Sequence, residues 1–190
     1  MNLLPIHVLG SPILRVETTP VAAVTDDLQR LIDDMFETMH AAQGIGLAAP
    51  QVGRSERLAV IDLGEDPIVI INPEIVHEEG SDRAEEGCLS IPDIYGDVDR
   101  ARRAVVRAMN RQGETFEIEA SDLLARCLQH EIDHLHGKLF IDYLSFLKRR
   151  AALSKWEGLK EKYPSMLRHL TPEEIRAARA ERASHPNEQI

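Results

Sequence analysis

Apolar residues recur at intervals of three and four in the segment "TDDLQRLIDDMFETMHAAQG" (25–44). This spacing places them on one face and predicts an amphipathic helix. Thr25 stands where an N-cap residue is expected, and two aspartates follow it at the positive end of the helix dipole. Gly44 and Gly46 are expected to end the helix, because glycine readily adopts the backbone conformation of a C-terminal cap.

A second segment, "SDLLARCLQHEIDHLHG" (121–137), is apolar around much of its helical circumference. This pattern predicts a helix buried inside the fold, with Ser121 as its N-cap and Gly137 near its C-terminal end. A third helix is predicted over about 145–162, "SFLKRRAALSKWEGLKEK", where Pro164 follows as a stop.

The segments "RLAVIDL" (57–63) and "IVIIN" (68–72) are rich in β-branched residues and predict strands. Two further strands, 103–109 and 114–120, flank the residues "NRQG", which are typical of a hairpin turn. The segment 77–87, "HEEGSDRAEEG", is polar and acidic, and it predicts a loop or a short hairpin.

The composition is that of a globular protein with one domain. The chain has 190 residues, of which 43% are hydrophobic, enough for a core built mainly from Leu, Ile, Val and Ala. The net charge of −10 disfavours general binding to nucleic acid, and we expect no DNA partner. Two cysteines do not form a disulfide framework, and we find neither a signal peptide nor a membrane-spanning stretch. We therefore expect a protein of the reducing cytoplasm, without a membrane partner.

The buried helix carries the motif H-E-x-x-H. His130 and His134 lie four residues apart and therefore on one helix face, about one turn from each other. Their imidazoles are placed to bind one metal ion, and Glu131 is placed to reach a water beside it. The alternative is a pair of core histidines whose hydrogen bonds are satisfied within the fold. We favour the metal, because polar groups on a mostly apolar helix need a partner.

A hydrolytic metal usually has three protein ligands, so one more is needed. Cys127 lies about 11 Å along the helix axis from His134, which favours the role of a small buried hydrophobe. Cys88 stands between Gly87 and Pro92 in irregular or edge-strand chain, free to approach another element. It could complete a Cys, His, His set. The candidates downstream of the motif are Asp142, Glu157, Glu161 and His169.

Three stretches resemble the signature motifs of peptide deformylases: "GIGLAAPQ" (44–51), "EGCLS" (86–90) and "QHEIDH" (129–134). They are complete and stand in that family's order, and "HGKLFIDYLS" (136–145) continues the similarity. The resemblance covers roughly residues 3 to 162. It implies an α+β fold in which small antiparallel or mixed sheets pack around a central buried HExxH helix, with a C-terminal helix.

The resemblance also implies the metal ligands and the reaction. Cys88, His130 and His134 would hold one divalent metal, Fe(II) natively, with zinc, nickel or cobalt also able to occupy the site. The reaction is hydrolysis of the N-formyl group from the initiator methionine of new polypeptides, which releases formate. Glu131 would transfer protons, and the Gln51 side chain would stabilise the negative charge on the formyl oxygen. The backbone N–H of Leu89 would share that role.

For the formylmethionyl substrate, the resemblance implies backbone hydrogen bonds from Ile45 and Gly46. An apolar pocket would receive the methionine side chain. It would be lined by Ile45, Leu124, Cys127 and His130. Glu86 is expected to orient Gln51 or its loop. Core packing is the alternative role of the apolar residues in this set.

The domain is expected to span 1–165, including the helix at about 145–162, and to be followed by a partly flexible tail, 166–190. Residues 148–162 carry a net charge of +4 within an acidic chain. Some relatives use a basic C-terminal helix to dock on ribosomal RNA, and the same docking is our hypothesis here. The alternative is a solvated helix face.

Two other functions remain open at this point. A zinc endopeptidase would use the same H-E-x-x-H chemistry, but the two additional motifs and a thiolate ligand argue against it. A structural metal site or redox-sensing module built on Cys88 and Cys127 belongs to another class. A Glu131→Gln variant of such a protein would bind its metal and lose no function.

Overall fold

A five-stranded antiparallel sheet lies at the centre of the computed structural model, which describes residues 2–64 and 66–184. Its strand order is β2–β3–β4–β7–β8, so β2 is an edge strand. The strands are β2 (Gly46–Ala48), β3 (Leu58–Ile61), β4 (Ile68–Glu79), β7 (Arg103–Met109) and β8 (Thr115–Ser121). The strands predicted around residues 60, 70, 106 and 117 are therefore confirmed, including the β7–β8 hairpin.

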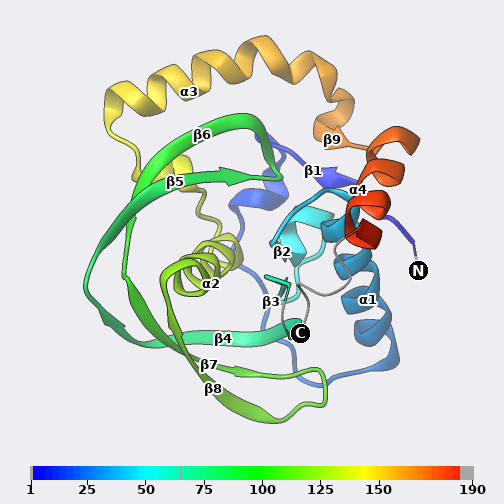
Figure 1. Cartoon of the computed structure of the whole chain (residues 1–190), viewed down its shortest axis with the longest axis vertical. Helices are drawn as coiled ribbons and strands as arrows, with labels where there is room; N and C mark the ends of the chain where they lie inside the picture. The colour runs from blue at the N-terminus through cyan, green and yellow to red at the C-terminus, as the bar shows by residue number, and fades with distance from the viewer. Residues whose placement is uncertain (1, 65, 185–190) are drawn as a thin grey trace.

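The helix α2 (Asp122–Leu135) lies between this sheet and a second, two-stranded one. That second sheet is the hairpin of β5 (Asp82–Cys88) and β6 (Ile91–Arg100). In Figure 1, α2 is seen nearly end-on, with β4, β7 and β8 below it and β5 and β6 above it. The predicted α+β architecture around a central buried helix is confirmed.

Strand β3 is buried on both faces, because each face of the sheet is covered by a helix. Leu58 and Val60 pack in the cluster that contains the apolar face of α1 (Asp26–Ala41). Ala59 and Ile61 point the other way and pack in the cluster that contains α2. This alternation follows from the two-residue period of a strand. This packing of β3 on the two helices holds β2, and the loop before it, against the middle of α2.

The C-terminal end of α1 differs from the prediction. The left-handed position belongs to Gln43, with φ of 56°, and not to a glycine. The N–H of Gln43 donates to His40 O, and that of Gly44 donates to Met39 O, which is the hydrogen-bond pattern of a Schellman cap. The predicted N-cap is confirmed, since Thr25 Oγ1 accepts a hydrogen bond from Leu28 N.

The acidic segment 77–87 is neither a loop nor a short hairpin, so that prediction was wrong: the two strands that it contains belong to different sheets. Its first residues belong to β4 and the others to β5, on either side of a turn at Gly80. The acidic side chains do not prevent strand pairing, because basic residues lie opposite them. Glu79 is paired in register with Arg103, and Asp82 with Arg100.

The chain returns to its beginning after the predicted third helix. This helix, α3 (Phe146–Leu159), runs along the outside of β6 (Figure 1). Strand β9 (Leu167–Arg168) then pairs with β1 (Ile6–His7). Helix α4 (Pro172–Ser184) packs against α1. The short 3-10 helices are Pro12–Arg15, Ala49–Val52, Phe140–Tyr143, Lys160–Lys162 and Pro164–Met166.

The predicted tail begins at residue 166, inside this returning segment. The domain boundary at 165 and the flexibility of the tail stay predictions, and residues 185–190 lie outside the described part of the chain. Among the described residues, no helix is both long and apolar enough to cross a membrane.

Candidate metal centre and active site

Cys88, His130 and His134 meet at one point between β5 and α2. Cys88 Sγ lies 3.3 Å from His134 Nε2, which lies 3.2 Å from His130 Nε2. In a tetrahedral site with metal–nitrogen bonds of about 2.0–2.1 Å, two ligand nitrogens lie about 3.3 Å apart. The three donor atoms therefore fit a single transition-metal ion. They are the one such group of three His, Cys, Asp or Glu side chains within residues 2–64 and 66–184.

A bulge in the hairpin brings Cys88 to α2. The β5–β6 register runs regularly to Glu86 opposite Gly96, and then shifts before Cys88 opposite Ile91. Gly87 lies in this bulge, where an added Cβ would be 2.7 Å from the ring of Tyr95. Any larger residue at this position would have to displace the Tyr95 ring.

The protonation state of His134 suits metal binding. Burial lowers the pKa of His134 well below its ordinary value. The imidazole is therefore neutral near pH 7, and neutral imidazole is the form that ligates a metal. The Nε2 atom faces Cys88 and His130, as a ligand atom must.

Glu86 holds the other side of the His130 ring. Its Oε2 lies 3.0 Å from His130 Nδ1, which orients the ring so that Nε2 faces the donor cluster. Two arginines reach the same carboxylate: Arg100 Nε donates to Oε1 at 2.9 Å, and Arg126 Nη1 at 2.8 Å. Burial alone would raise the pKa of Glu86, but hydrogen bonds from His130 and Arg100 outweigh it and lower the pKa to about 2. Glu86 is thus ionised and fixed.

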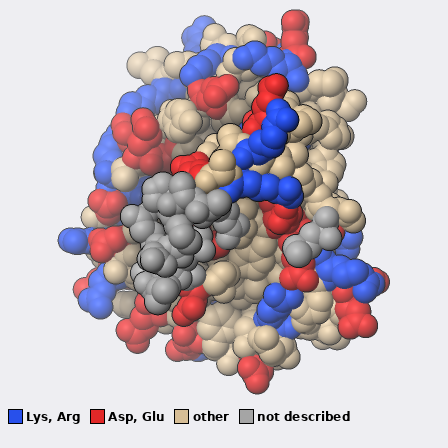
Figure 2. All heavy atoms as spheres, turned by 45° about the vertical axis from the view of Figure 1, so that its right-hand side comes forward, with Lys and Arg blue, Asp and Glu red and all other residues tan. Residues whose placement is uncertain are grey.

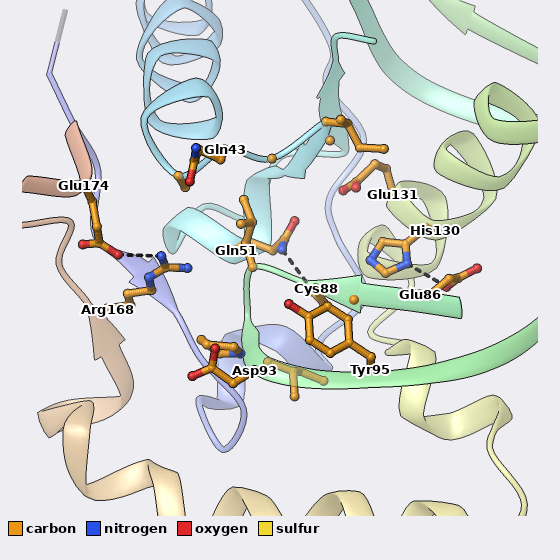
Figure 3. Close-up of a pocket in the computed structure, with 18 of the residues that line it drawn as sticks. Gln43, Gln51, Glu86, Cys88, Asp93, Tyr95, His130, Glu131, Arg168 and Glu174 are labelled. Carbon is orange, nitrogen blue, oxygen red and sulfur yellow. Dashed lines mark hydrogen bonds and ion pairs between the residues drawn. The ribbon is translucent and has the colours of Figure 1, made fainter. Parts of the chain in front are cut away.

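Among the described residues, no hydrogen bond joins Glu86 to Gln51 or to its loop, so the expected orientation of either one by Glu86 is not supported. Glu86 points toward α2, while Gln51 has three other partners. Its Oε1 accepts from Ala48 N at 2.8 Å, and its Nε2 donates to Ser90 Oγ at 3.2 Å. The same Nε2 lies 3.5 Å from Cys88 Sγ. The Gln51 amide is therefore held beside the donor cluster (Figure 3).

Replacing Arg100 with Gln is expected to destabilise the protein by about 3 kcal/mol, because it leaves the buried carboxylate of Glu86 and the half-buried one of Asp133 short of a partner. The matched control is Arg102→Gln, two residues away. Arg102 pairs with Asp122 at an exposed position, so its loss is expected to cost about 0–1 kcal/mol. Urea unfolding of both variants measures the two effects. Equal losses of stability in the two variants would contradict a stabilising role for the ion pairs of Arg100 with Glu86 and Asp133.

Glu131 is buried beside the donor cluster, with one oxygen free. Its Oε2 has no hydrogen-bond partner within the described residues. Its other oxygen lies against Gly46, where an added Cβ would be only 2.3 Å away. Burial raises the pKa of Glu131 to about 7, although His130 opposes this in part. A carboxylate with a pKa near neutrality is suited to take up and release protons.

The raised pKa predicts a pH-dependent stability of the metal-free protein. The folded value of about 7 lies above the ordinary 4.5, so ionisation of Glu131 opposes folding. The cost begins as pH rises above 4.5 and is complete above 7, where it reaches about 3 kcal/mol. Glu131→Gln should therefore stabilise the metal-free protein at pH 8, and the gain should shrink toward pH 5. A gain independent of pH in denaturant titrations would contradict this.

A cavity of about 940 Å³ opens onto these residues. It is lined by Gln51, Glu86, Cys88, Leu89, His130 and Glu131, and also by Ile45, Gly46 and Cys127. Leu124, which we had expected in the pocket, instead packs against the core beneath α2. Its neighbour Leu123 lines the cavity, because successive residues of a helix point about 100° apart.

The open edge of β2 borders the cavity. The carbonyl of Ile45 already accepts from Asp62 N on the β3 side, at 3.0 Å. Backbone groups of successive residues in an extended strand point to opposite sides. Those of Gly46 therefore point to the open edge, as does the N–H of Ala48 that donates to Gln51.

The other metal-ligand candidates lie outside the donor cluster. Asp142 pairs with Arg15, and Glu157 with Lys160. Cys127 is buried, with its Sγ 3.8 Å from the carbonyl oxygen of Ile45, and it is not part of the donor cluster.

Sequence reasoning missed Arg126, Ser90 and the C-terminal residues that line the cavity. Arg126 is a charged residue at a helix position with buried neighbours, which was a usable signal. Ser90 lies within the quoted "EGCLS" motif but was given no role.

Comparisons with known proteins give a consistent result. The sequence model of the family described as Polypeptide deformylase matches residues 3–150. The peptide deformylase of Alkalilimnicola ehrlichii is 55% identical over 163 residues, which cover 84% of this chain and 92% of the relative. That of Hydrogenovibrio crunogenus is 56% identical over 147 residues, 76% of this chain and 87% of the relative.

Solved structures agree with the sequences. The crystal structure of a peptide deformylase from Legionella pneumophila superposes with a TM-score of 0.80 at 49% identity, covering 86% of this chain and 100% of that one. The enzyme from Synechococcus elongatus, in complex with actinonin, gives a TM-score of 0.77 at 44% identity, covering 80% and 85%. Family match, sequence identity and shared fold together show that this chain belongs to the peptide deformylase family.

Proposed function

We propose that this chain's deformylase reaction takes place at Cys88, His130 and His134, with Glu131 as the proton-transfer group. As a member of the family, the protein removes the N-formyl group from the initiator methionine of nascent polypeptides and releases formate. One observation carries the residue assignment. A thiol and two imidazoles converge on one point beside a buried carboxylate with a free oxygen, at the wall of a large cavity.

We assign the metal ligands as Cys88 Sγ, His130 Nε2 and His134 Nε2. A bound divalent metal supplies Lewis-acid chemistry there, lowering the pKa of water and polarising a carbonyl oxygen. We propose Fe(II) as the native ion. A thiolate with two imidazoles also suits zinc, nickel and cobalt, so these ions are expected to occupy the same donors.

Glu131 moves the protons of the reaction. Its free Oε2 accepts a proton from the water that attacks the formyl carbon. A carbon–oxygen bond forms, and the carbon–nitrogen bond of the formamide then breaks. Glu131 delivers the proton to the departing amine, which leaves poorly without it. The products are formate and a peptide with a free methionine N-terminus.

Gln51 and Leu89 stabilise the charge that develops on the formyl oxygen. The Gln51 amide is fixed through its own oxygen by Ala48 N, so its Nε2 stays aimed at the cluster. The backbone N–H of Leu89, directly after Cys88, is the second proposed donor. Fixed donors of this kind cost no reorganisation when charge develops.

Gly46 pairs with the substrate main chain along the open edge of β2, as an added strand would. Ile45 contributes its side chain and not its carbonyl, which Asp62 already occupies. We propose that Ile45, Leu123 and Cys127 contact the methionine side chain. This replaces Leu124 in the predicted pocket.

Product analysis separates this function from an endopeptidase. Formyl-Met-Ala-Ser incubated with the metal-loaded protein should lose its formyl group only, as seen by mass spectrometry. Cleavage between Met and Ala, or between Ala and Ser, would overturn the assignment.

We propose a cytoplasmic location and docking on the ribosome through α3. Lys and Arg side chains follow the upper part of the molecule, over α3, with Asp and Glu between them (Figure 2). Phe146 and Leu147 at the start of α3 are 76% and 75% exposed, and they flank this basic face. Exposed apolar residues beside basic ones are typical of a binding surface.

Charge reversal of α3 tests the docking. Truncation is unsuitable, because Ala152 and Trp156 of α3 are buried in the core. The double substitution Arg149→Glu with Arg150→Glu should reduce co-sedimentation with ribosomes severalfold and make the remaining binding less dependent on salt, because fewer phosphate contacts release fewer counterions. Arg103→Glu, at an exposed position of β7, is the control. Unchanged co-sedimentation of the double variant would contradict the proposal.

A further inference from the structure

One wall of the cavity comes from residues beyond the family match, which ends at residue 150. We call it the outer wall and define it as Lys162–Glu174. Tyr163, Arg168 and Glu174 of this segment line the cavity together with the residues of the metal centre. In Figure 3, Arg168 and Glu174 lie on the opposite side of the pocket from His130 and Glu86.

The outer wall is fixed to the rest of the fold at several points. The ring of Tyr163 stacks on Trp156 of α3, with centroids 5.7 Å apart. Val8 N donates to Met166 O at 3.0 Å, and Ile6 is paired in register with Arg168. A wall held this way presents its side chains at defined positions to whatever enters the cavity.

Arg168 is held in place by Glu174. Its Nη2 donates to Glu174 Oε1 at 2.9 Å, and its side chain is only 19% exposed. Glu174 is itself fixed by a capping box at the start of α4. Its Oε2 accepts from Thr171 N at 2.7 Å, and its N–H donates to Thr171 Oγ1 at 3.2 Å. A guanidinium has five N–H donors, so Arg168 keeps donors for a ligand beyond this one ion pair.

The size of the cavity decides which part of a substrate reaches Arg168. About 940 Å³ is at the upper end of the range for sites that enclose drug-sized ligands. A formylmethionyl group at the metal centre leaves room beyond it, and an extended chain advances about 3.3 Å per residue. Residues that follow methionine therefore run toward the outer wall.

We propose that Arg168 is a specificity-determining residue that binds a carboxylate or carbonyl oxygen on the residues after methionine, and that it favours an acidic side chain over a basic one there. This inference rests on the proposed function of the metal centre. Asp93 also lines the outer part of the cavity. The negative charge of Asp93 opposes an acidic side chain near it. The preference for an acidic side chain is therefore limited to the substrate position that faces Arg168.

The test compares formyl-Met-Ala-Ser-Asp with formyl-Met-Ala-Ser-Lys, and the same pair with the charged residue third. The wild-type protein should favour the Asp peptide of at least one pair by about three- to tenfold in kcat/KM, carried by KM. Arg168→Gln should abolish this ratio. Glu174→Gln keeps the capping box and frees guanidinium donors, so it should increase the ratio.

The opposite effects of the two variants exclude a merely structural role. If Arg168 only tied β9 to α4, removing either half of the ion pair would change the ratio in the same direction. Arg176→Gln, on exposed α4 outside the cavity, is the matched control with an unchanged ratio. Equal ratios for wild type and Arg168→Gln would overturn the proposal. Absence of formate from formyl-Met-Ala with wild-type enzyme would instead overturn the proposed function.

Discussion

Replacing Glu131 with Gln is expected to lower kcat for formate release by about 10²- to 10⁴-fold while the metal stays bound. Gln has nearly the same shape, so the cavity beside Gly46 remains filled. It lacks a carboxylate to accept the water proton and return it to the amine. The three donor atoms of the metal centre come from other residues and keep their arrangement.

Metal content and turnover measured on the same preparation separate the two functions of the H-E-x-x-H motif, metal binding and proton transfer. The expected result is about one metal per chain in both proteins and turnover only in wild type. A Glu131→Gln protein that keeps its full turnover would contradict the proton-transfer role. Loss of metal together with turnover would mean that Glu131 contributes to holding the ion.

Replacing Gly46 with Ala is expected to lower kcat/KM by about 100-fold. The added Cβ would lie 2.3 Å from Glu131 Oε1, closer than real contacts allow, and in a tight contact of 3.0 Å with Cys127 Sγ. Because the surroundings are buried, the carboxylate itself has to shift, and misplacement of a catalytic group by about 1 Å costs about 10² in rate. Steady-state kinetics with formyl-Met-Ala-Ser measures the effect.

Gly158→Ala is the matched control for this substitution. Nothing lies within 4 Å of a Cβ added at Gly158, which is part of helix α3. Alanine there should stabilise the protein by about 0.5–1 kcal/mol and leave kcat/KM unchanged. Wild-type turnover in Gly46→Ala would mean that the Glu131 carboxylate is not held against β2.

Local patterns predicted α1, α2, α3 and the β7–β8 hairpin, because each has its own periodicity, cap or turn residues. They failed for β5, whose acidic residues resemble a loop until its pairing with β6, which places Arg100 opposite Asp82, is known. They also failed at the end of α1, where Gln43 takes the left-handed position that glycine was expected to fill. Tertiary packing decides both cases.

The metal centre, too, could be predicted from local patterns only in part. The helix spacing of His130 and His134 could be predicted from periodicity, but the position of Cys88 beside them depends on a hairpin 42 residues earlier, and the motif resemblance identified it. The partners of Glu86 could not be predicted, since Arg100 and Arg126 are 14 and 40 residues away along the chain. Only the assembled fold places the outer wall beside the cavity.

The most direct test of the central claim is formate release from formyl-Met-Ala-Ser by anaerobically purified protein, with metal content determined on the same sample. We expect formate at a turnover that scales with metal content, up to about one divalent ion per chain, and we expect Cys88→Ser to lose both together. A stoichiometric metal at Cys88, His130 and His134 without any formate would contradict this claim, because the donor cluster would then hold an ion for structure or for another substrate.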